Sequence, residues 1–178
     1  MRVGVVDVHY DEDGGGATAA LVVYGDRTFA SVVAEHVARV EDIEPYEPGA
    51  LFRRELPGIR AVLALDGPLD LLVVDGYATL DPQGRPGLGA RVSEAFDVPV
   101  IGVAKTRFRA ATHAVEVLRG ASGRPLHVTA AGGITIEGAA AVVAGMAGRH
   151  RIPDALARVD RLARGRALVG DARVPRDG

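Results

Sequence analysis

The chain has no cysteine, and only one of its 178 residues is a lysine, Lys105. Without cysteine, the protein cannot form a disulfide, a thiolate metal site or a cysteine nucleophile. Its apolar runs are too short to span a bilayer, and its first residues lack the charged and apolar segments of a signal peptide. We therefore expect a cytoplasmic protein, and the length predicts a single domain over residues 1–178.

The sequence also lacks the signatures of several enzyme classes. The Gly- and Pro-rich segment 76–87 contains neither a GxGxxG nor a Walker sequence, no nucleophile elbow is present, and the five histidines show no HExxH spacing. The net charge of −2 gives no overall basic field, which counts against bulk binding of nucleic acid but allows a local arginine surface. Because all the other Lys/Arg positions are arginine, Lys105 stands out as a compact point charge.

Two apolar segments each carry an aspartate at the exit of a buried strand. Residues 69–76 read Leu-Asp-Leu-Leu-Val-Val-Asp-Gly, and residues 3–8 read Val-Gly-Val-Val-Asp-Val. Such aliphatic runs are typical of parallel strands buried on both faces, and ligands bind beyond the carboxyl ends of these strands. If the strands bring Asp7 and Asp75 together, a divalent cation is the usual way to neutralise the pair. The alternative is that each aspartate caps a turn or the following helix.

The hydrophobic periodicity predicts an α/β fold. We expect a mixed sheet that opens with an antiparallel β-meander and carries helices on both faces. Strands are expected at 3–8, 17–23, 28–38, 69–75, 98–104, 115–117 and 125–129, and helices at 50–65, 88–96, 136–147 and 153–164. Pro57 lies inside the first helical segment, so we expect a kink there or two separate helices.

Two acidic residues and one aromatic residue are further site candidates. Glu55 lies in the first helical segment and Asp160 in the last, and each has arginines beside it, which is the ordinary setting of a solvated ion pair. Tyr46 stands between two prolines, so its ring is rigidly placed. An exposed ring of this kind can stack on a nucleobase, and the alternative is a tyrosine that covers the core.

Five blocks of sequence, in order along nearly the whole chain, resemble the endonuclease V family. They are Val-Gly-Val-Val-Asp-Val-His-Tyr at 3–10, Pro-Tyr-Glu-Pro-Gly at 45–49 with Arg-Glu-Leu-Pro at 54–57, Leu-Val-Val-Asp-Gly at 72–76, Pro-Val-Ile-Gly-Val-Ala-Lys at 99–105 and Arg-Ile-Pro-Asp at 151–154. The resemblance implies a ribonuclease H-like fold. It also implies a metal-dependent repair endonuclease that hydrolyses the phosphodiester on the 3′ side of a deaminated base, which is deoxyinosine in DNA and, in some members, inosine in RNA.

The resemblance assigns catalytic roles to individual residues. Asp7, Glu55 and Asp75 match the catalytic carboxylates that bind magnesium, with manganese as an alternative, and Asp160 matches a further position of that metal site. Lys105 matches the catalytic lysine near the scissile phosphate. The chemistry fits, because magnesium takes oxygen ligands and can both activate water and stabilise charge on a phosphate.

Other residues match positions that hold the nucleic acid. Tyr46 matches the wedge that fills the gap left by the displaced base. The base pocket is matched by Leu51, Gly76, Gly87 and Leu88. The implied partner is DNA, or in some members RNA, that contains inosine, and we expect the protein to bind it as a monomer.

The chain departs from the family at several positions. Ala78 stands where a glycine beside the base pocket is usual, Asp81 replaces a histidine close to the metal site, and residues 129–133 lack the usual serine and histidine of a loop. The helical segment that usually precedes the first strand is absent as well, so we expect a weaker grip on the strand and lower selectivity. Two alternatives stay open: a nucleic-acid-binding protein that cleaves weakly or not at all, and a non-catalytic module that binds a protein partner.

Overall fold

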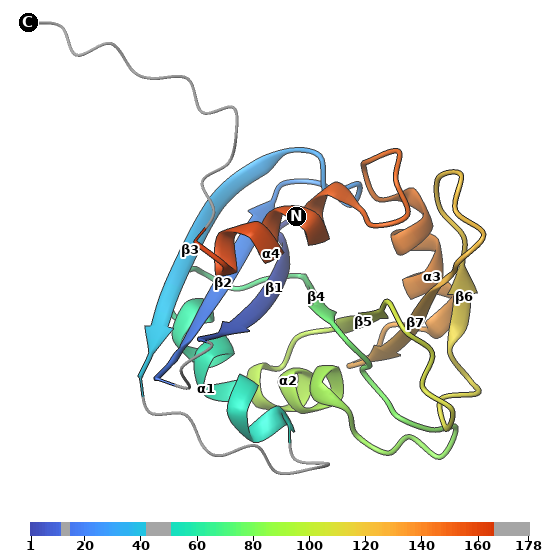
Figure 1. The fold of residues 1–178 in the computed structure, drawn as a ribbon, viewed down its shortest axis with the longest axis horizontal. Helices are drawn as coiled ribbons and strands as arrows, with labels where there is room; N and C mark the ends of the chain where they lie inside the picture. Colours follow the sequence, from blue (N-terminus) through green and yellow to red (C-terminus); the bar gives the residue numbers. More distant parts are fainter. Residues whose placement is uncertain (12–14, 42–50, 166–178) are drawn as a thin grey trace, which may run out of the picture.

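The computed structural model describes residues 1–11, 15–41 and 51–165, apart from the side chain of Leu51. Within these residues the chain forms a seven-stranded sheet in the order β3-β2-β1-β4-β5-β7-β6 (Figure 1). Strands β1, β2 and β3 form an antiparallel meander, β1, β4 and β5 are parallel, and β7 and β6 are antiparallel additions. The predicted mixed sheet is therefore confirmed, with these bounds: β1 Val3–Tyr10, β2 Ala17–Tyr24, β3 Val32–Val40, β4 Leu71–Asp75, β5 Val100–Ala104, β6 Val115–Val117 and β7 Leu126–Ala131.

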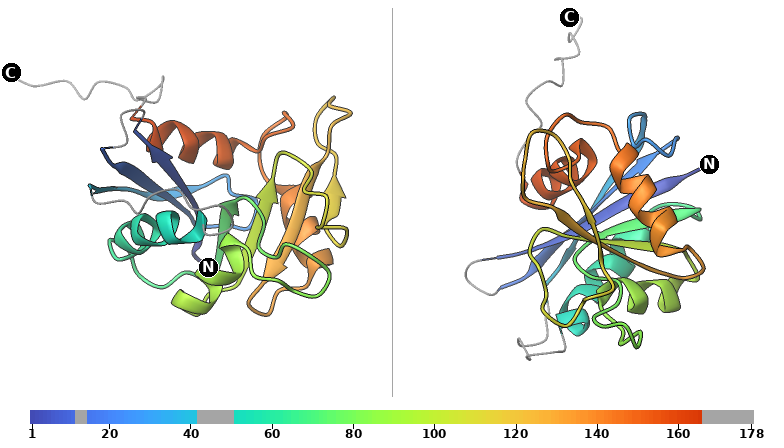
Figure 2. Two further views of the ribbon diagram at one scale, coloured as in Figure 1. Left: turned by 60° about the horizontal axis from the view of Figure 1, so that its bottom comes forward. Right: turned by 90° about the vertical axis from the view of Figure 1, so that its right-hand side faces the viewer.

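Helices cover both faces of this sheet, as the sequence predicts. One face carries α1 (Leu51–Leu63) and α2 (Leu88–Phe96), and the other carries α3 (Ile136–Gly145) and α4 (Asp154–Ala163). Figure 2 shows the two helix layers on either side of the strands. Because side chains alternate along each strand, the sheet has one apolar core under each helix layer.

Strand register brings Asp7 and Asp75 to the same level of the sheet. Strands β1 and β4 are parallel with Val6 opposite Val74, the last pair between them, so Asp7 and Asp75 are the next residue in each strand. Asp75 ends β4, whereas β1 continues to Tyr10, beyond the sequence-predicted end at residue 8, paired with β2. The residues two positions earlier in each strand pack in the core with α3 and α4, so both aspartates point toward that face. The fold therefore places two carboxylates beside each other at the carboxyl edge of the central strands.

The loop that follows Asp75 lies close against β5 and β7. A Cβ atom on Gly102 would lie 2.3 Å from the backbone nitrogen of Ala78, so this close approach requires glycine. The same nitrogen donates a hydrogen bond of 2.7 Å to Oγ1 of Thr129, a fully buried residue. Residues 129–131 belong to β7. The strand predicted to end at Thr129 therefore continues through Ala131, and the expectation of a loop is wrong for Ala130 and Ala131.

Most element bounds differ from the sequence prediction by a few residues, and two of the differences have a clear physical reason. Strand β3 begins at Val32 instead of residue 28, because the Asp26 carboxylate accepts hydrogen bonds from the backbone nitrogens of Thr28 at 2.8 Å and Ser31 at 2.9 Å. Helix α1 continues through Pro57, so the expected alternative of two helices is wrong. The proline removes one backbone donor without ending the helix. In the described part of the chain, no helix is both long and apolar enough to cross a membrane.

Candidate active site

Asp7 and Asp75 form the centre of an acidic group, directly after the last paired residues of β1 and β4. Burial is the main reason that the pKa of Asp7 rises to about 6, and the nearby Asp75 carboxylate raises it further. Lys105 acts in the opposite direction on Asp7, through its positive charge. Like charges this close are costly unless a proton or a cation compensates them. The predicted meeting of the two strand-end aspartates is thus what the fold produces.

Helix α1 adds Glu55 to this group. Burial raises the pKa of Glu55 to about 7, and the charges of Asp7 and Asp75 add to the effect. One carboxylate oxygen, Oε2, is buried and has no hydrogen-bond partner among the residues that the structure describes. A buried carboxylate oxygen without a donor is costly, and a cation can compensate it. The donor set fits a hard divalent ion, which prefers several carboxylate oxygens and retained waters.

The acidic group does not form a closed metal cage. Among the residues that the structure describes, no three His, Cys, Asp or Glu side chains lie close enough together to make a complete ligand set. Within the group, the charge of Asp75 raises the pKa values of Asp7 and Glu55, and Lys105 Nζ donates a hydrogen bond to Asp75 Oδ2. A cation at this site would have to compete with Lys105 for that oxygen.

Lys105 reaches Asp75 from the exit of the neighbouring strand, β5. Asp75 lies opposite Val103 in the parallel pair, so Lys105 follows two residues later and projects from the same face. Its backbone carbonyl accepts a hydrogen bond of 2.6 Å from Nη2 of Arg151, which also binds the carbonyl of Pro125 at 2.9 Å. Sequence reasoning gave Arg151 no role, although it begins the Arg-Ile-Pro-Asp block at 151–154.

Asp160 lies near the acidic group but already has a partner. Its charge contributes to the raised pKa of Asp7, so α4 brings it within electrostatic reach. At the same time its Oδ1 accepts a hydrogen bond of 2.9 Å from Nε of Arg164, one helical turn later. Asp160 therefore forms an ion pair on its own helix and also lies within electrostatic reach of Asp7.

A cleft of about 280 Å³ opens directly beside the acidic group. Glu55 and Asp75 line it, and so do three of the residues predicted for the base pocket, Gly76, Gly87 and Leu88. Gly76 has a φ of +132°, and a Cβ on Gly87 would lie 2.5 Å from a backbone oxygen. Both positions therefore require glycine, for two different physical reasons. The remaining candidates, Tyr46 and the side chain of Leu51, lie outside the described residues.

The cleft has further lining residues that sequence reasoning did not select. They are Phe52, Tyr77, Leu80 and Pro86. The lining is therefore mostly apolar, and its charged side chains are the two carboxylates at one end. The only signal in the sequence was proximity, because Tyr77 and Leu80 follow Asp75 within the same loop and Phe52 precedes Glu55 by one helical turn.

Two residues that depart from the family pattern, Ala78 and Asp81, have surroundings other than those that the sequence suggests. Ala78 is fully buried and is absent from the described lining of the cleft, so its methyl group does not narrow it. Asp81 accepts a hydrogen bond of 3.0 Å from the backbone nitrogen of Arg85 and pairs with that guanidinium at 3.4 Å. Its negative charge is thus compensated within its own turn, and it is not among the causes of the raised pKa values of Asp7 and Glu55.

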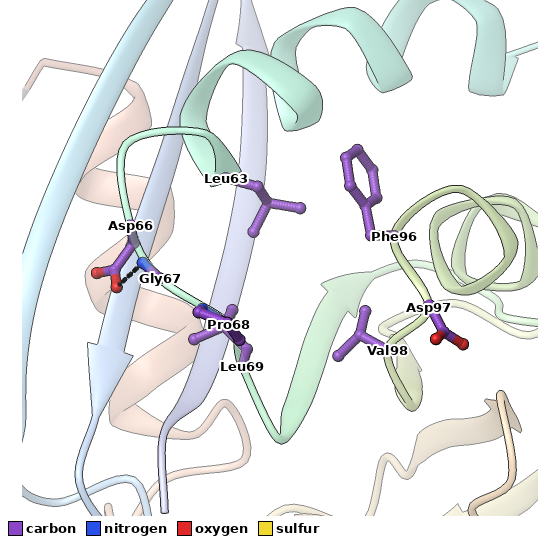
Figure 3. A pocket seen from close by; sticks show the side chains of 8 residues that line it. All are labelled: Leu63, Asp66, Gly67, Pro68, Leu69, Phe96, Asp97 and Val98. Atoms are coloured by element: carbon purple, nitrogen blue, oxygen red, sulfur yellow. Dashed lines mark hydrogen bonds between the residues drawn. The ribbon is translucent and has the colours of Figure 1, made fainter.

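A second cavity, of about 340 Å³, lies at the opposite edge of the sheet, between the ends of α1 and α2. Figure 3 shows its apolar side chains, including Leu63, Phe96 and Val98, around the hollow. The Asp66 carboxylate already has hydrogen-bond partners: Nε2 of His36 at 2.7 Å and the backbone nitrogen of Gly67 at 2.6 Å. This cavity therefore lacks the chemistry of the first cleft.

Comparison with known proteins agrees with this arrangement. The sequence model of the family Endonuclease V matches residues 1–122. An endonuclease V from Streptomyces avermitilis is 35% identical over 94% of this chain and 80% of its own length. A solved endonuclease V structure from the same organism is 31% identical, covers 93% of this chain and 80% of its own, and has a TM-score of 0.78.

More distant structures share the fold. An endonuclease V from Ciona intestinalis, solved in complex with a 23-mer DNA that contains an inosine followed by a ribo-adenosine, has a TM-score of 0.80 at 20% identity and covers 92% of this chain and 84% of its own. An Argonaute, Aa-Ago, matches at a TM-score of 0.60 and 10% identity, over 92% of this chain and 27% of its own. The ribonuclease H-like fold is confirmed. The chain belongs to the endonuclease V family and is a nuclease, a hydrolase of phosphodiester bonds.

Proposed function

We propose that this nuclease uses a divalent metal to hydrolyse the phosphodiester on the 3′ side of a deaminated base, with deoxyinosine in DNA as its principal substrate. We further propose that it acts as a monomer in the cytoplasm. One observation carries the proposal: Glu55 and Asp75 belong both to the acidic group and to the lining of the apolar cleft. A base held in the cleft therefore has its own phosphodiester close to the carboxylates.

The metal would be held by Asp7, Glu55 and Asp75, and Asp160, whose charge acts on Asp7, would be a further member of the site. Magnesium suits these oxygen donors, and manganese is the expected substitute. When bound, the ion supplies an activated water and compensates the charge that develops on the phosphate. The unpartnered Oε2 of Glu55 supports this assignment, because it is the atom that most needs a positive partner.

Lys105 would exchange one anionic partner for another. It donates to Asp75 here, and a phosphate oxygen at the strand exits presents the same kind of acceptor. An Asp75 carboxylate that holds a metal would leave the ammonium of Lys105 free to face the phosphate. Lys105 then stabilises the negative charge of the transition state at the place where the bond breaks.

The cleft would receive the base after it leaves the stack. Extruding a base costs a few kcal/mol, and a mismatched or damaged base costs least. The apolar lining of the cleft favours a flat, unstacked base over water. The Ciona relative was solved with an inosine-containing DNA, which supports inosine as the occupant. The predicted wedge, Tyr46, would stack in the gap left behind.

The direct test is a cleavage panel with one labelled strand sequence. The central base is inosine, uracil, an abasic site or undamaged, and each strand is made as DNA and as RNA. We expect magnesium-dependent cleavage that is fastest for deoxyinosine, one fixed position on its 3′ side, and no cleavage in EDTA. Equal cleavage of all the strands would contradict the assigned substrate. Tight, salt-dependent binding without cleavage would instead indicate the non-cleaving alternative.

A further inference from the structure

Tyr77 connects the cleft to the segment that follows Lys105. The residue lines the cleft, two positions after Asp75. Its hydroxyl donates a hydrogen bond of 2.9 Å to the carbonyl of Thr106 and accepts one of 2.8 Å from the backbone nitrogen of Phe108. The tyrosine and phenylalanine rings also pack against each other, with centroids 6.0 Å apart. Both hydrogen bonds of the hydroxyl are therefore made to the segment directly after Lys105.

The backbone of Tyr77 is itself held on both sides. The backbone nitrogen of Gly76, before it, donates a hydrogen bond of 2.9 Å to the carbonyl of Val103. The backbone nitrogen of Ala78, after it, donates one of 2.7 Å to Oγ1 of Thr129. The Tyr77 carbonyl accepts from the nitrogen of Gly89 at 3.3 Å. These bonds attach Tyr77 to β5, β7 and the start of α2. The hydroxyl thus extends from a fixed point.

The segment after Lys105 has little else to hold it. Residues 106–110 are exposed, and in the described part of the chain the two bonds to the Tyr77 hydroxyl are their only hydrogen bonds to a distant segment. The other bonds of residues 106–110 are local turns, such as the one from Ala111 to Phe108 at 3.1 Å. On the other side, Arg151 holds the carbonyl of Lys105 itself. Tyr77 is therefore the anchor on the cleft side.

This anchor does not depend on charge. The Lys105–Asp75 bond must open when the ammonium turns to a phosphate, whereas the bonds of the Tyr77 hydroxyl involve neither group. They can persist through that exchange. We propose that Tyr77 is a positioning residue for Lys105: its hydroxyl fixes residues 106–108 against the cleft, so that the ammonium stands at a set distance from a nucleotide bound there. The inference rests on the proposed function in assigning Lys105 to the phosphate.

The test is Tyr77→Phe, which keeps the ring and removes only the hydroxyl. We expect kcat on the inosine strand to fall about tenfold with KM nearly unchanged, because the cleft remains and the ammonium loses its set position. The backbone amide of Phe108 should exchange with solvent roughly tenfold faster. Tyr24→Phe is the matched control, since Tyr24 lies in the core against Phe29, and it should leave both readouts unchanged.

Wild-type kcat and unchanged Phe108 exchange in Tyr77→Phe would overturn the inference. A rise in KM with unchanged kcat would also overturn it, because Tyr77 would then be a contact of the cleft alone. Failure of the proposed function looks different: the wild-type chain would cleave no strand of the panel. In that case the exchange rate of Phe108 still decides whether the hydroxyl holds the segment, and an unchanged rate refutes it.

Discussion

Lys105 Nζ donates a hydrogen bond to Asp75 Oδ2 across the exits of β5 and β4. The only lysine of the chain thus compensates one of the carboxylates that crowd this edge of the sheet. Two competitions follow from the contact. A metal competes with the ammonium for Asp75, and a phosphate competes with Asp75 for the ammonium.

Replacing Lys105 by alanine should slow the chemical step far more than it weakens binding. Loss of a charge-stabilising donor at a transition state typically costs on the order of 100-fold in kcat. The measurement is kcat and KM on the inosine strand, with Arg107→Ala as control, since Arg107 is an exposed cation two residues away. A parallel loss of affinity and rate in Lys105→Ala would mean that the lysine binds ground state and transition state equally.

Neutralising Glu55 should stabilise the protein while removing activity. Its Oε2 is buried without a partner near two other carboxylates, so Glu55→Gln should raise the free energy of unfolding in EDTA by about 1–2 kcal/mol. Thermal melts of both proteins with and without magnesium measure this. Magnesium should raise the Tm of the wild type but not that of the variant. Glu94→Gln, at a largely exposed position on α2, should change neither value.

A stabilising effect of magnesium that is equally large in Glu55→Gln would place the ion elsewhere. A lower Tm of Glu55→Gln in EDTA would mean that the carboxylate has a favourable partner in solution.

Much of this site could be predicted because its parts are local in sequence. The aliphatic runs at 3–6 and 71–74 marked two buried strands, and the aspartate directly after each run followed from the same pattern. Bringing Asp7 and Asp75 together required only that the strands be parallel neighbours, which is the common arrangement for such runs. The glycines of the cleft were found through the family resemblance, and the structure supplies the physical reasons at Gly76 and Gly87.

What could not be predicted depends on contacts between distant segments. The bond from Lys105 to Asp75 spans 30 residues, and the bond from Phe108 to the Tyr77 hydroxyl spans 31. No local pattern distinguishes such a tyrosine from any other loop aromatic. Ala78 was placed beside the base pocket through the family resemblance, because a glycine is usual at that position. Its burial depends on two residues far along the chain, because Gly102 lies against its backbone nitrogen and Thr129 accepts a hydrogen bond from it.

Ala78→Gly therefore tests the structural account of selectivity against the sequence-based one. If the methyl group narrowed the base pocket, its removal would increase the ratio of inosine to undamaged cleavage. Because the methyl group is fully buried outside the cleft lining, we expect that ratio to stay unchanged. The free energy of unfolding should fall by about 1–2 kcal/mol, from the lost methyl contact and the added backbone freedom. A clear gain in inosine preference would restore the sequence-based view.

The turn before β3 should contribute to stability in a pH-dependent manner. Hydrogen bonds from Thr28 and from the backbone of Ser31 hold the pKa of the Asp26 carboxyl well below its usual range. A lowered pKa means that the charged form stabilises the fold above the unfolded-state pKa, near 4, and that this contribution is lost as the pH falls further. The Tm difference between wild type and Asp26→Asn should be constant from pH 7 to 5 and shrink below about pH 4. A difference that is equal at pH 6 and pH 3 would exclude this role.

The central claim is that Asp75 and its neighbours form the metal-dependent catalytic site. The most direct measurement is cleavage of the deoxyinosine strand by Asp75→Asn and wild type at one magnesium concentration, with matched melting curves. Asp97→Asn is the control, because Asp97 caps α2 at the opposite edge of the sheet in a left-handed conformation that asparagine tolerates. We predict that Asp75→Asn cleaves on the order of 100-fold more slowly or worse while melting as a folded protein, and that Asp97→Asn cleaves normally. Wild-type cleavage by a folded Asp75→Asn would contradict the account.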